Sequence, residues 1–106
     1  MTWRPRVPQL CYEVTVDVEA MLADALQKYM VKKHLPEIFA TGCFAEIRFL
    51  QEGPTRYRTQ YWATDETRLD DYLTRHAEAM RADFLLHFPR GVSIQRSVWN
   101  LRAKWP

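Results

Sequence analysis

Apolar and polar residues alternate along residues 11–18, CYEVTVDV, with the period of a half-buried β-strand. The period then changes, because apolar residues recur every three or four positions up to about His34 and predict an amphipathic helix that Asp17 can cap. The apolar stripe of this helix consists of Met21, Leu22, Ala25, Leu26, Tyr29 and Met30. Pro36 suits the first turn of a separate short helix, PEIFA, which Gly42 can end in the left-handed conformation.

The second half of the chain predicts a β-hairpin, a long helix and a last strand. Strands at 43–50 and 56–63 flank the turn sequence QEGPT. Thr64 or Asp65 can cap the long helix that follows, and Pro89 ends it. The apolar stripe of the long helix consists of Leu69, Leu73, His76, Met80, Phe84 and His87. The sequence VSIQRSVWNL reads as the final strand.

The resulting order, β-α-β-β-α-β, predicts an α+β protein of the ferredoxin-like type. Right-handed crossovers would fold it into a four-stranded antiparallel sheet of order 4-1-3-2, with both helices on one face. A chain of 106 residues suits one domain. We expect that domain at 11–101, between an N-terminal arm at 1–10 and a C-terminal tail at 102–106.

The charges of the hairpin select its register. A three-residue loop would set Arg48 directly opposite Arg58, and like charges in that position destabilise a strand pair. A longer loop that pairs Gln51 with Tyr57 sets Arg48 beside Gln60 instead. We therefore predict the longer loop.

The sheet face away from the helices, here termed the outer face, is polar but also carries large apolar groups. The residues expected on it are Glu13, Thr15, Phe44, Glu46, Arg48, Leu50, Arg58, Gln60, Trp62, Gln95 and Trp99. The face can be solvated, can be a homodimer interface, or can be an RNA platform. Stacking of bases needs aromatic residues on the two central strands, whose outer positions are not aromatic, so nucleic acid is disfavoured. We favour a homodimer interface formed by Glu46, Arg48, Arg58, Gln60, Trp62 and Trp99.

Several short segments carry a resemblance to a known family. The runs YEVTVDV, HLPEIFATGCF, TQYW, LDDYL and HAEAMR are similar to a family of short bacterial proteins described only as a domain of unknown function. The family pattern also has a histidine near position 84, where this chain has Phe84. More distantly, H-x-P before a glycine-ended turn resembles dimeric α+β barrel proteins, among them antibiotic-biosynthesis monooxygenases and the ethyl tert-butyl ether degradation type. That resemblance implies a sheet-to-sheet homodimer with a small-molecule pocket between sheet and helices.

Four side chains are candidates for binding a ligand in such a pocket: His34, Tyr12, Tyr61 and His76. His34 can simply be a cation that suits the end of a helix, or it can hold an anionic or carbonyl group together with the first amides of the PEIFA helix. His76 lies on an apolar stripe and is either a core histidine or a donor in the pocket. The two tyrosines bring hydroxyl groups to the helix-facing side of the sheet, where each needs a partner.

No metal site and no cofactor are predicted. His76 and His87 are three helical turns apart, roughly 16 Å at the helical rise, so they cannot hold one metal together. Spaced cysteine pairs and a histidine pair at i, i+4 are absent from the sequence. Cys11 and Cys43 are expected to be two buried thiols.

Composition excludes partners that are selected by bulk charge. The net charge is +2, and acidic and basic residues are interleaved, so no basic block points to nucleic acid or to an anionic membrane. No apolar run is long enough for a membrane span or a signal peptide, and the cytoplasm is the expected compartment. The sequence thus favours a small dimeric protein that binds or acts on a small organic molecule. A purely structural or regulatory homodimer is the alternative.

Overall fold

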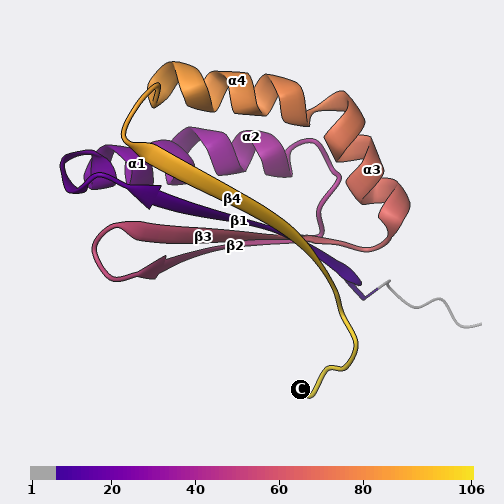
Figure 1. The fold of residues 1–106 in the computed structure, drawn as a ribbon. Helices are drawn as coiled ribbons and strands as arrows, with labels where there is room; N and C mark the ends of the chain where they lie inside the picture. Colours follow the sequence, from indigo (N-terminus) through magenta and orange to yellow (C-terminus); the bar gives the residue numbers. More distant parts are fainter. Residues whose placement is uncertain (1–6) are drawn as a thin grey trace, which may run out of the picture.

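The computed structural model describes residues 7–106, and four antiparallel strands form its sheet. These strands are β1 (Leu10–Val18), β2 (Glu46–Glu52), β3 (Arg56–Ala63) and β4 (Val92–Asn100). Their order is β2-β3-β1-β4, which is the predicted 4-1-3-2 order (Figure 1). Of the predicted N-terminal arm, residues 1–6 lie outside the described part of the chain, and Gln9 already bonds to the backbone of the sheet.

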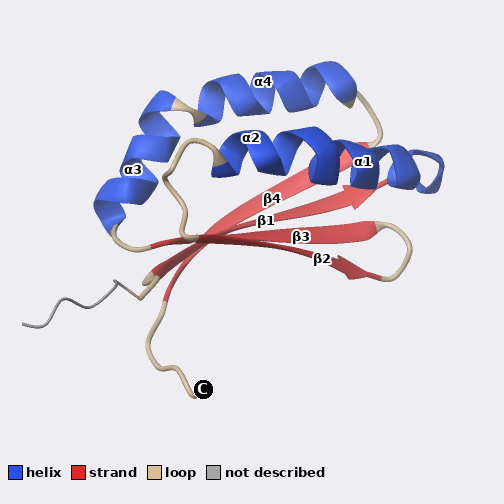
Figure 2. Cartoon of the chain, turned by 180° about the vertical axis from the view of Figure 1, so that it is seen from behind, coloured by secondary structure: helices blue, strands red, loops and turns tan. Residues whose placement is uncertain are grey.

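All helices cover the same face of the sheet, which confirms the ferredoxin-like α+β architecture (Figures 1 and 2). The helices are α1 (Ala23–Tyr29), α2 (Leu35–Phe39), α3 (Glu66–Arg75) and α4 (Ala77–His87). A 3-10 turn, Ala20–Leu22, precedes α1, and a π-helical turn, Met30–His34, connects α1 to α2. No described helix has the length and apolar character needed to cross a membrane.

The hairpin has the predicted register. Gln51 lies opposite Tyr57, and Arg48 lies opposite Gln60 rather than opposite Arg58. The arginines on neighbouring strands are thereby offset, as the electrostatic argument requires.

The predicted start of the second strand is wrong. β2 begins at Glu46, and residues 40–45 form a loop that enters the space between helices and sheet. Phe44 is therefore not on the outer face. Its side chain is 4% exposed, and its ring centroid lies 4.9 Å from that of Tyr72. Strand alternation cannot place a residue that precedes the strand.

The start of the first helix also differs from the prediction. Asp17 does not cap it, because its carboxylate pairs with Arg56 at 2.7 Å across the sheet. The 3-10 turn shifts the helical phase, so Met21 and Ala25 are exposed whereas Ala23 is buried.

The break expected before Pro36 does not occur, because the helix continues through a π turn. Leu35 has helical dihedral angles, and its N–H donates to the carbonyl of Met30, five residues earlier. A proline inside an α-helix lacks one N–H and crowds the carbonyl four residues earlier. The wider π turn accommodates this proline without ending the helix. Gly42 does adopt the predicted left-handed conformation, with φ of 77°.

The long second helix is in fact two helices. The chain bends at His76, where φ is −123°, so α3 and α4 run in different directions (Figure 1). Asp65 caps α3 by accepting from the N–H of Arg68 at 2.9 Å. The bend ends the common stripe, and Leu73 is 38% exposed.

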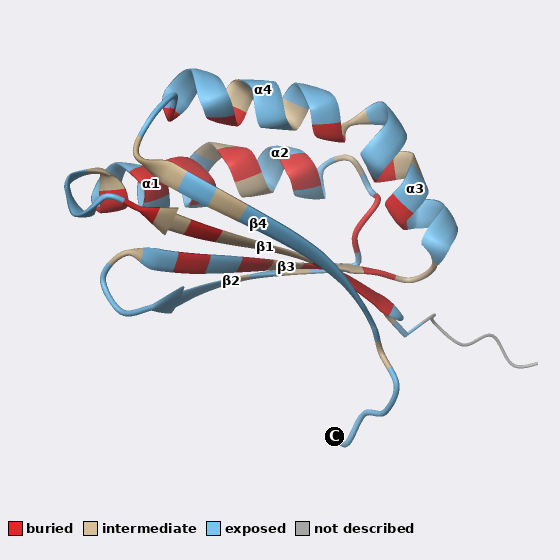
Figure 3. Ribbon diagram, in the orientation of Figure 1, coloured by how far each residue is buried: buried red, intermediate tan, exposed pale blue. Residues whose placement is uncertain are grey.

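Burial is concentrated between the helices and the sheet (Figure 3). The core comprises one cluster around Ile38, Phe44 and Tyr72 and another around Leu26, Tyr57 and Phe84. Most of β4, an edge strand, is exposed. The helix layer therefore leaves room for a cavity near that edge.

Candidate ligand-binding cavity

A cavity of about 290 Å³ lies between the helix layer and the β1–β4 side of the sheet. Its walls come from β1, β3, β4, α3, α4 and the π turn. They are formed by Tyr12, Val14, Val16, Met30, His34, Tyr61, Tyr72, Met80, Arg81, Phe84, Leu85, Ile94 and Arg96. Arg81, Leu85 and Arg96 are exposed, so the cavity communicates with solvent between α4 and the edge strand.

Three of the four predicted ligand residues meet in this cavity. Tyr12 and Tyr61 reach it from neighbouring strands, and His34 reaches it from the π turn. His76 is not among the lining residues, because the bend between α3 and α4 sets it beside Cys43 and Asp71 instead. The free helix amides expected next to His34 do not exist, since α2 continues directly from the π turn.

The π turn determines what His34 contacts. Residues five apart in an α-helix are about 140° apart around the axis, so their side chains diverge. The wider turn between Tyr29 and His34 brings the two side chains together, and the Tyr29 hydroxyl lies 3.3 Å from His34 Nδ1. Their ring centroids are 5.4 Å apart.

This contact selects the tautomer of the imidazole. The Tyr29 hydroxyl donates its single proton to Asp83 Oδ2 at 2.6 Å. Tyr29 can therefore only accept from His34, so Nδ1 carries the ring proton and Nε2 has the lone pair. The hydrogen bond that the described residues make to this ring involves Nδ1 and not Nε2, and the His34 side chain lines the cavity.

Burial keeps this histidine neutral. His34 is 9% exposed, and desolvation lowers its pKa to about 4, against the opposing effect of the Asp83 and Glu37 carboxylates. Burial and the hydrogen bond to Asp83 raise the pKa of Tyr29, so the phenol keeps its proton at neutral pH.

A lysine holds Asp83 in place at the outer end of this network. Lys33 Nζ donates to Asp83 Oδ2 at 2.8 Å and to Glu37 at 2.9 Å. Hydrogen bonds from Lys33 and Tyr29 lower the pKa of the Asp83 carboxyl. Asp83 therefore stays ionised, and the order Lys33, Asp83, Tyr29, His34 leads from the surface to the cavity.

Two arginines give the cavity its positive charge, and neither was identified from sequence. Arg81 Nη2 donates to the Tyr12 hydroxyl at 3.0 Å, joining α4 to β1, and Arg96 reaches the cavity from β4. Burial raises the pKa of Tyr61 and of Tyr72, which keeps these phenols uncharged. A long helix with one stripe would have placed Arg81 on the solvent side, which is why pattern analysis missed it.

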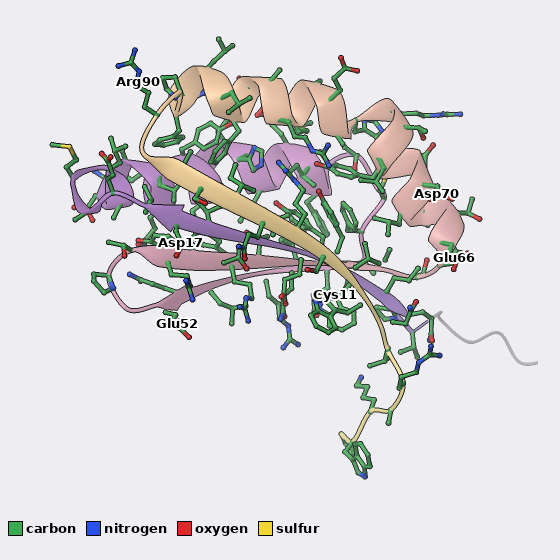
Figure 4. The ribbon with its side chains drawn as sticks, viewed as in Figure 1. Cys11, Asp17, Glu52, Glu66, Asp70 and Arg90 are labelled. Carbon is green, nitrogen blue, oxygen red and sulfur yellow. The ribbon has the colours of Figure 1, made fainter. Side chains whose placement is uncertain are left out.

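The carboxylates of the outer face are paired with polar and basic side chains, both across strands and along one strand. Gln60 donates to Glu13 at 3.1 Å, Arg58 lies 3.5 Å from the same carboxylate, and Arg48 pairs with Glu46 at 3.0 Å. Figure 4 shows the side chains that project from this face, with Cys11 near one end. Trp99 remains 58% exposed.

A second cluster of chemically active groups lies outside the cavity. Cys43 Sγ, an Asp71 oxygen and a His76 ring nitrogen all lie within 4.8 Å of one another. Both cysteines are buried and unpaired, as predicted, and burial raises the pKa of Cys11 to about 11. Sequence spacing did not reveal the cluster because its members come from a loop, a helix and a bend.

Solved structures with the same fold extend over almost the whole chain. A protein of unknown function from Nitrosomonas europaea, NE2512, is 20% identical, with a TM-score of 0.67 over 96% of this chain and 98% of that one. A monooxygenase of Streptomyces coelicolor, ActVA-Orf6 in complex with nanaomycin D, has a TM-score of 0.73 at 11% identity over 93% and 92% of the two chains.

A dimeric ferredoxin-like protein from an uncultured marine organism has a TM-score of 0.63 at 14% identity over 93% of this chain and 100% of that one. At these identities the likeness concerns the fold. No curated protein matches the sequence. The family model of the domain of unknown function DUF4286 matches residues 9–101, and the chain therefore belongs to that family, in agreement with the resemblance seen in its motifs.

Proposed function

We propose that this protein binds a compact, largely apolar organic molecule that carries an acidic or carbonyl oxygen, and that His34 acts as a base toward it. The observation that carries the proposal is the Nε2 lone pair of a neutral histidine on the wall of a cavity. A neutral imidazole with one free lone pair accepts a hydrogen bond at pH 7, and its low pKa means that it takes the proton itself only from a strongly acidic group.

The size and the charge of the cavity restrict which ligands can bind in it. Its volume of about 290 Å³ is at the small end of the range for ligand sites. Aliphatic and aromatic walls favour a flat or compact hydrocarbon body. Arg81 and Arg96 favour an oxygen that is negative or becomes negative when His34 removes a proton.

A solved structure with the same fold supports the proposal that the cavity binds an organic molecule. The Streptomyces coelicolor monooxygenase is described in complex with nanaomycin D, a ligand, so this fold is compatible with binding an organic compound. The buried, unpaired cysteines suit a reducing compartment, and we include the cytoplasm in the proposal.

Binding of 2-naphthoate and of uncharged naphthalene, measured by calorimetry, tests the recognition of an oxygen anion. We expect 2-naphthoate to bind at least tenfold more tightly, since a charge-assisted hydrogen bond is worth about 1.5–3 kcal/mol. Arg81→Ala should remove that preference. Arg90→Ala should not, because Arg90 lies beyond the end of α4 and does not line the cavity (Figure 4). Equal binding of both probes, or equal effects of both variants, would contradict the proposal.

A proton-transfer role for His34 has its own readout. 2-Naphthol bound beside Nε2 should donate a hydrogen bond to it. Excitation makes the naphthol hydroxyl strongly acidic, so the excited molecule should transfer this proton to the imidazole, which changes its emission spectrum. His34→Asn can still donate to Tyr29 through its amide but lacks the ring lone pair, so binding should persist while the spectral shift disappears. An unchanged spectral shift in His34→Asn would remove His34 from the site.

We also propose that the outer face forms a homodimer interface that includes Glu46, Arg48, Arg58, Gln60, Trp62 and Trp99. Arg48 and Arg58 already neutralise the carboxylates of Glu46 and Glu13 on this face, so a second copy can approach without net repulsion. Exposed Trp99 and Leu50 would supply apolar contact, as interfaces prefer. The related fold described as dimeric supports the proposal.

Light scattering on two tryptophan variants tests the interface. Trp99→Glu should convert dimers to monomers, whereas Trp105→Glu should not, because Trp105 lies in the C-terminal tail and is 81% exposed. A wild-type protein that is monomeric at micromolar concentration would refute the interface and would favour a solvated face.

A further inference from the structure

We infer that Cys43, Asp71 and His76 form a zinc site, separate from the helix–sheet cavity. Thiolate, carboxylate and imidazole are the three ligand types that Zn²⁺ takes from proteins. Their donor atoms all lie within 4.8 Å of one another. The inference departs from the sequence-based expectation of no metal and does not depend on the proposed ligand.

The distances are close to those of a coordinated ion. Bond lengths of roughly 2.0–2.3 Å in a tetrahedral site set neighbouring ligand atoms about 3.5 Å apart. Cys43 Sγ already lies 3.5 Å from Asp71 Oδ2. A change of roughly 1 Å in the His76 side chain completes the triangle.

Each ligand is held by its surroundings. Arg75 Nε binds the other oxygen of Asp71 at 3.0 Å and leaves Oδ2 directed toward Cys43. The His76 ring stacks on Tyr72, with centroids 6.3 Å apart. The backbone N–H of Cys43 donates to Thr41 Oγ1 at 3.3 Å, which fixes the loop. Such outer contacts orient metal ligands and raise affinity.

The bend between α3 and α4 gives the site its shape. Asp71 and His76 are five residues apart and would diverge on a regular α-helix. The departure from helical geometry at His76 returns its ring to the side of Asp71. The break that divides the long helix thus has a chemical consequence, because it assembles two ligands.

The charges of the three ligands and their exposure to solvent suit Zn²⁺. On binding, Cys43 loses its thiol proton to solvent, and thiolate plus carboxylate balance the two charges of Zn²⁺. Cys43 is buried, whereas Asp71 and His76 are partly exposed, so an ion can enter from their side. Water can occupy the fourth position, as in open zinc sites.

Titration of the full-length, metal-free protein with Co²⁺ tests the site, because a tetrahedral cobalt thiolate has visible d–d bands and a near-ultraviolet charge-transfer band. We expect one equivalent to bind and Zn²⁺ to displace it. Zn²⁺ at a hundredfold excess over its dissociation constant should raise Tm by about 10 °C.

The chain offers a matched control for each ligand. Cys43→Ser should abolish the charge-transfer band and lower Zn²⁺ affinity at least roughly a hundredfold. Cys11→Ser should not, although Cys11 is equally buried. His76→Gln should weaken binding similarly, whereas His87→Gln should not, and this pair remains informative if Cys43→Ser fails to fold.

Two results would overturn the inference. One is the absence of stoichiometric binding at micromolar Co²⁺ or Zn²⁺. The other is binding that survives both Cys43→Ser and His76→Gln, since the metal would then lie elsewhere.

Discussion

Stability of the fold should depend on pH through His34. The unfolded chain takes up a proton near the ordinary histidine pKa of 6.5, whereas desolvation lowers the pKa of His34 in the fold to about 4. Between these values the unfolded state binds one more proton, so the free energy of unfolding falls as the pH falls. Above pH 7 this contribution to stability is complete, and below pH 4 it is lost.

The difference in pKa sets the magnitude. About 2.5 pKa units at 1.36 kcal/mol each give a total loss of about 3 kcal/mol, of which about 2 kcal/mol is lost between pH 7 and pH 5. Hydrogen bonds from Lys33 and Tyr29 lower the pKa of the neighbouring Asp83 carboxyl below its ordinary value of 3.8, so protonation of Asp83 affects the free energy of unfolding only below this pH window. Measurement above pH 5 therefore avoids the contribution of Asp83.

Urea unfolding of three proteins at pH 7 and pH 5 checks the prediction. Between pH 7 and pH 5 the free energy of unfolding of the wild type and of His87→Gln should each fall by about 2 kcal/mol more than that of His34→Asn, because asparagine has no proton to gain at position 34. The imidazole nitrogen shifts in NMR should show His34 neutral, with the proton on Nδ1, down to pH 5. The same pH dependence in His34→Asn as in the wild type, or an NMR pKa above 6, would refute the assignment of a buried neutral histidine.

Three substitutions test the packing and the turns. Phe44→Ala should lower the free energy of unfolding by about 3–5 kcal/mol because a buried ring between two tyrosines is lost, while Phe39→Ala, at a 54% exposed position, should cost far less. Gly91→Ala should lower the free energy of unfolding more than Gly53→Ala does, although both glycines have positive φ. A Cβ at Gly91 would lie 2.7 Å from a leucine side chain, whereas a Cβ at Gly53 would meet nothing within 4 Å. Tyr29→Phe should cost about 1–3 kcal/mol by leaving the Nδ1 proton of the buried histidine without an acceptor. Chemical denaturation measures each cost, and a Phe44→Ala protein as stable as Phe39→Ala would contradict the description of the core.

The topology and the hairpin register were predictable because they depend on long patterns. Alternation over eight residues identifies a strand and both of its faces, and the repulsion between Arg48 and Arg58 excludes one register. These arguments use many residues at once, so one irregular position does not change them. They also place Tyr12 and Tyr61 on the helix-facing side.

The local irregularities were not predictable, and they form both candidate sites. A stripe with helical period gives no sign of a bend at His76, because the stripe assumes a constant turn angle. Arg81 and the partners of His76 follow from that bend. A loop before a strand has no fixed parity, and Phe44 was misplaced for that reason.

Pro36 links the sequence to the chemistry proposed for His34. In a regular α-helix, Tyr29 and His34 would lie on different sides, and the imidazole would have no fixed tautomer. The proline disfavours that helix, and the π turn that replaces it brings the phenol to Nδ1. Nδ1 is thereby committed as a donor, and Nε2 is left as a base beside the cavity. The segment KKHLP therefore continues the helix instead of ending it. Lys33 holds the acid of the network, and Pro36 favours the geometry that orients the histidine.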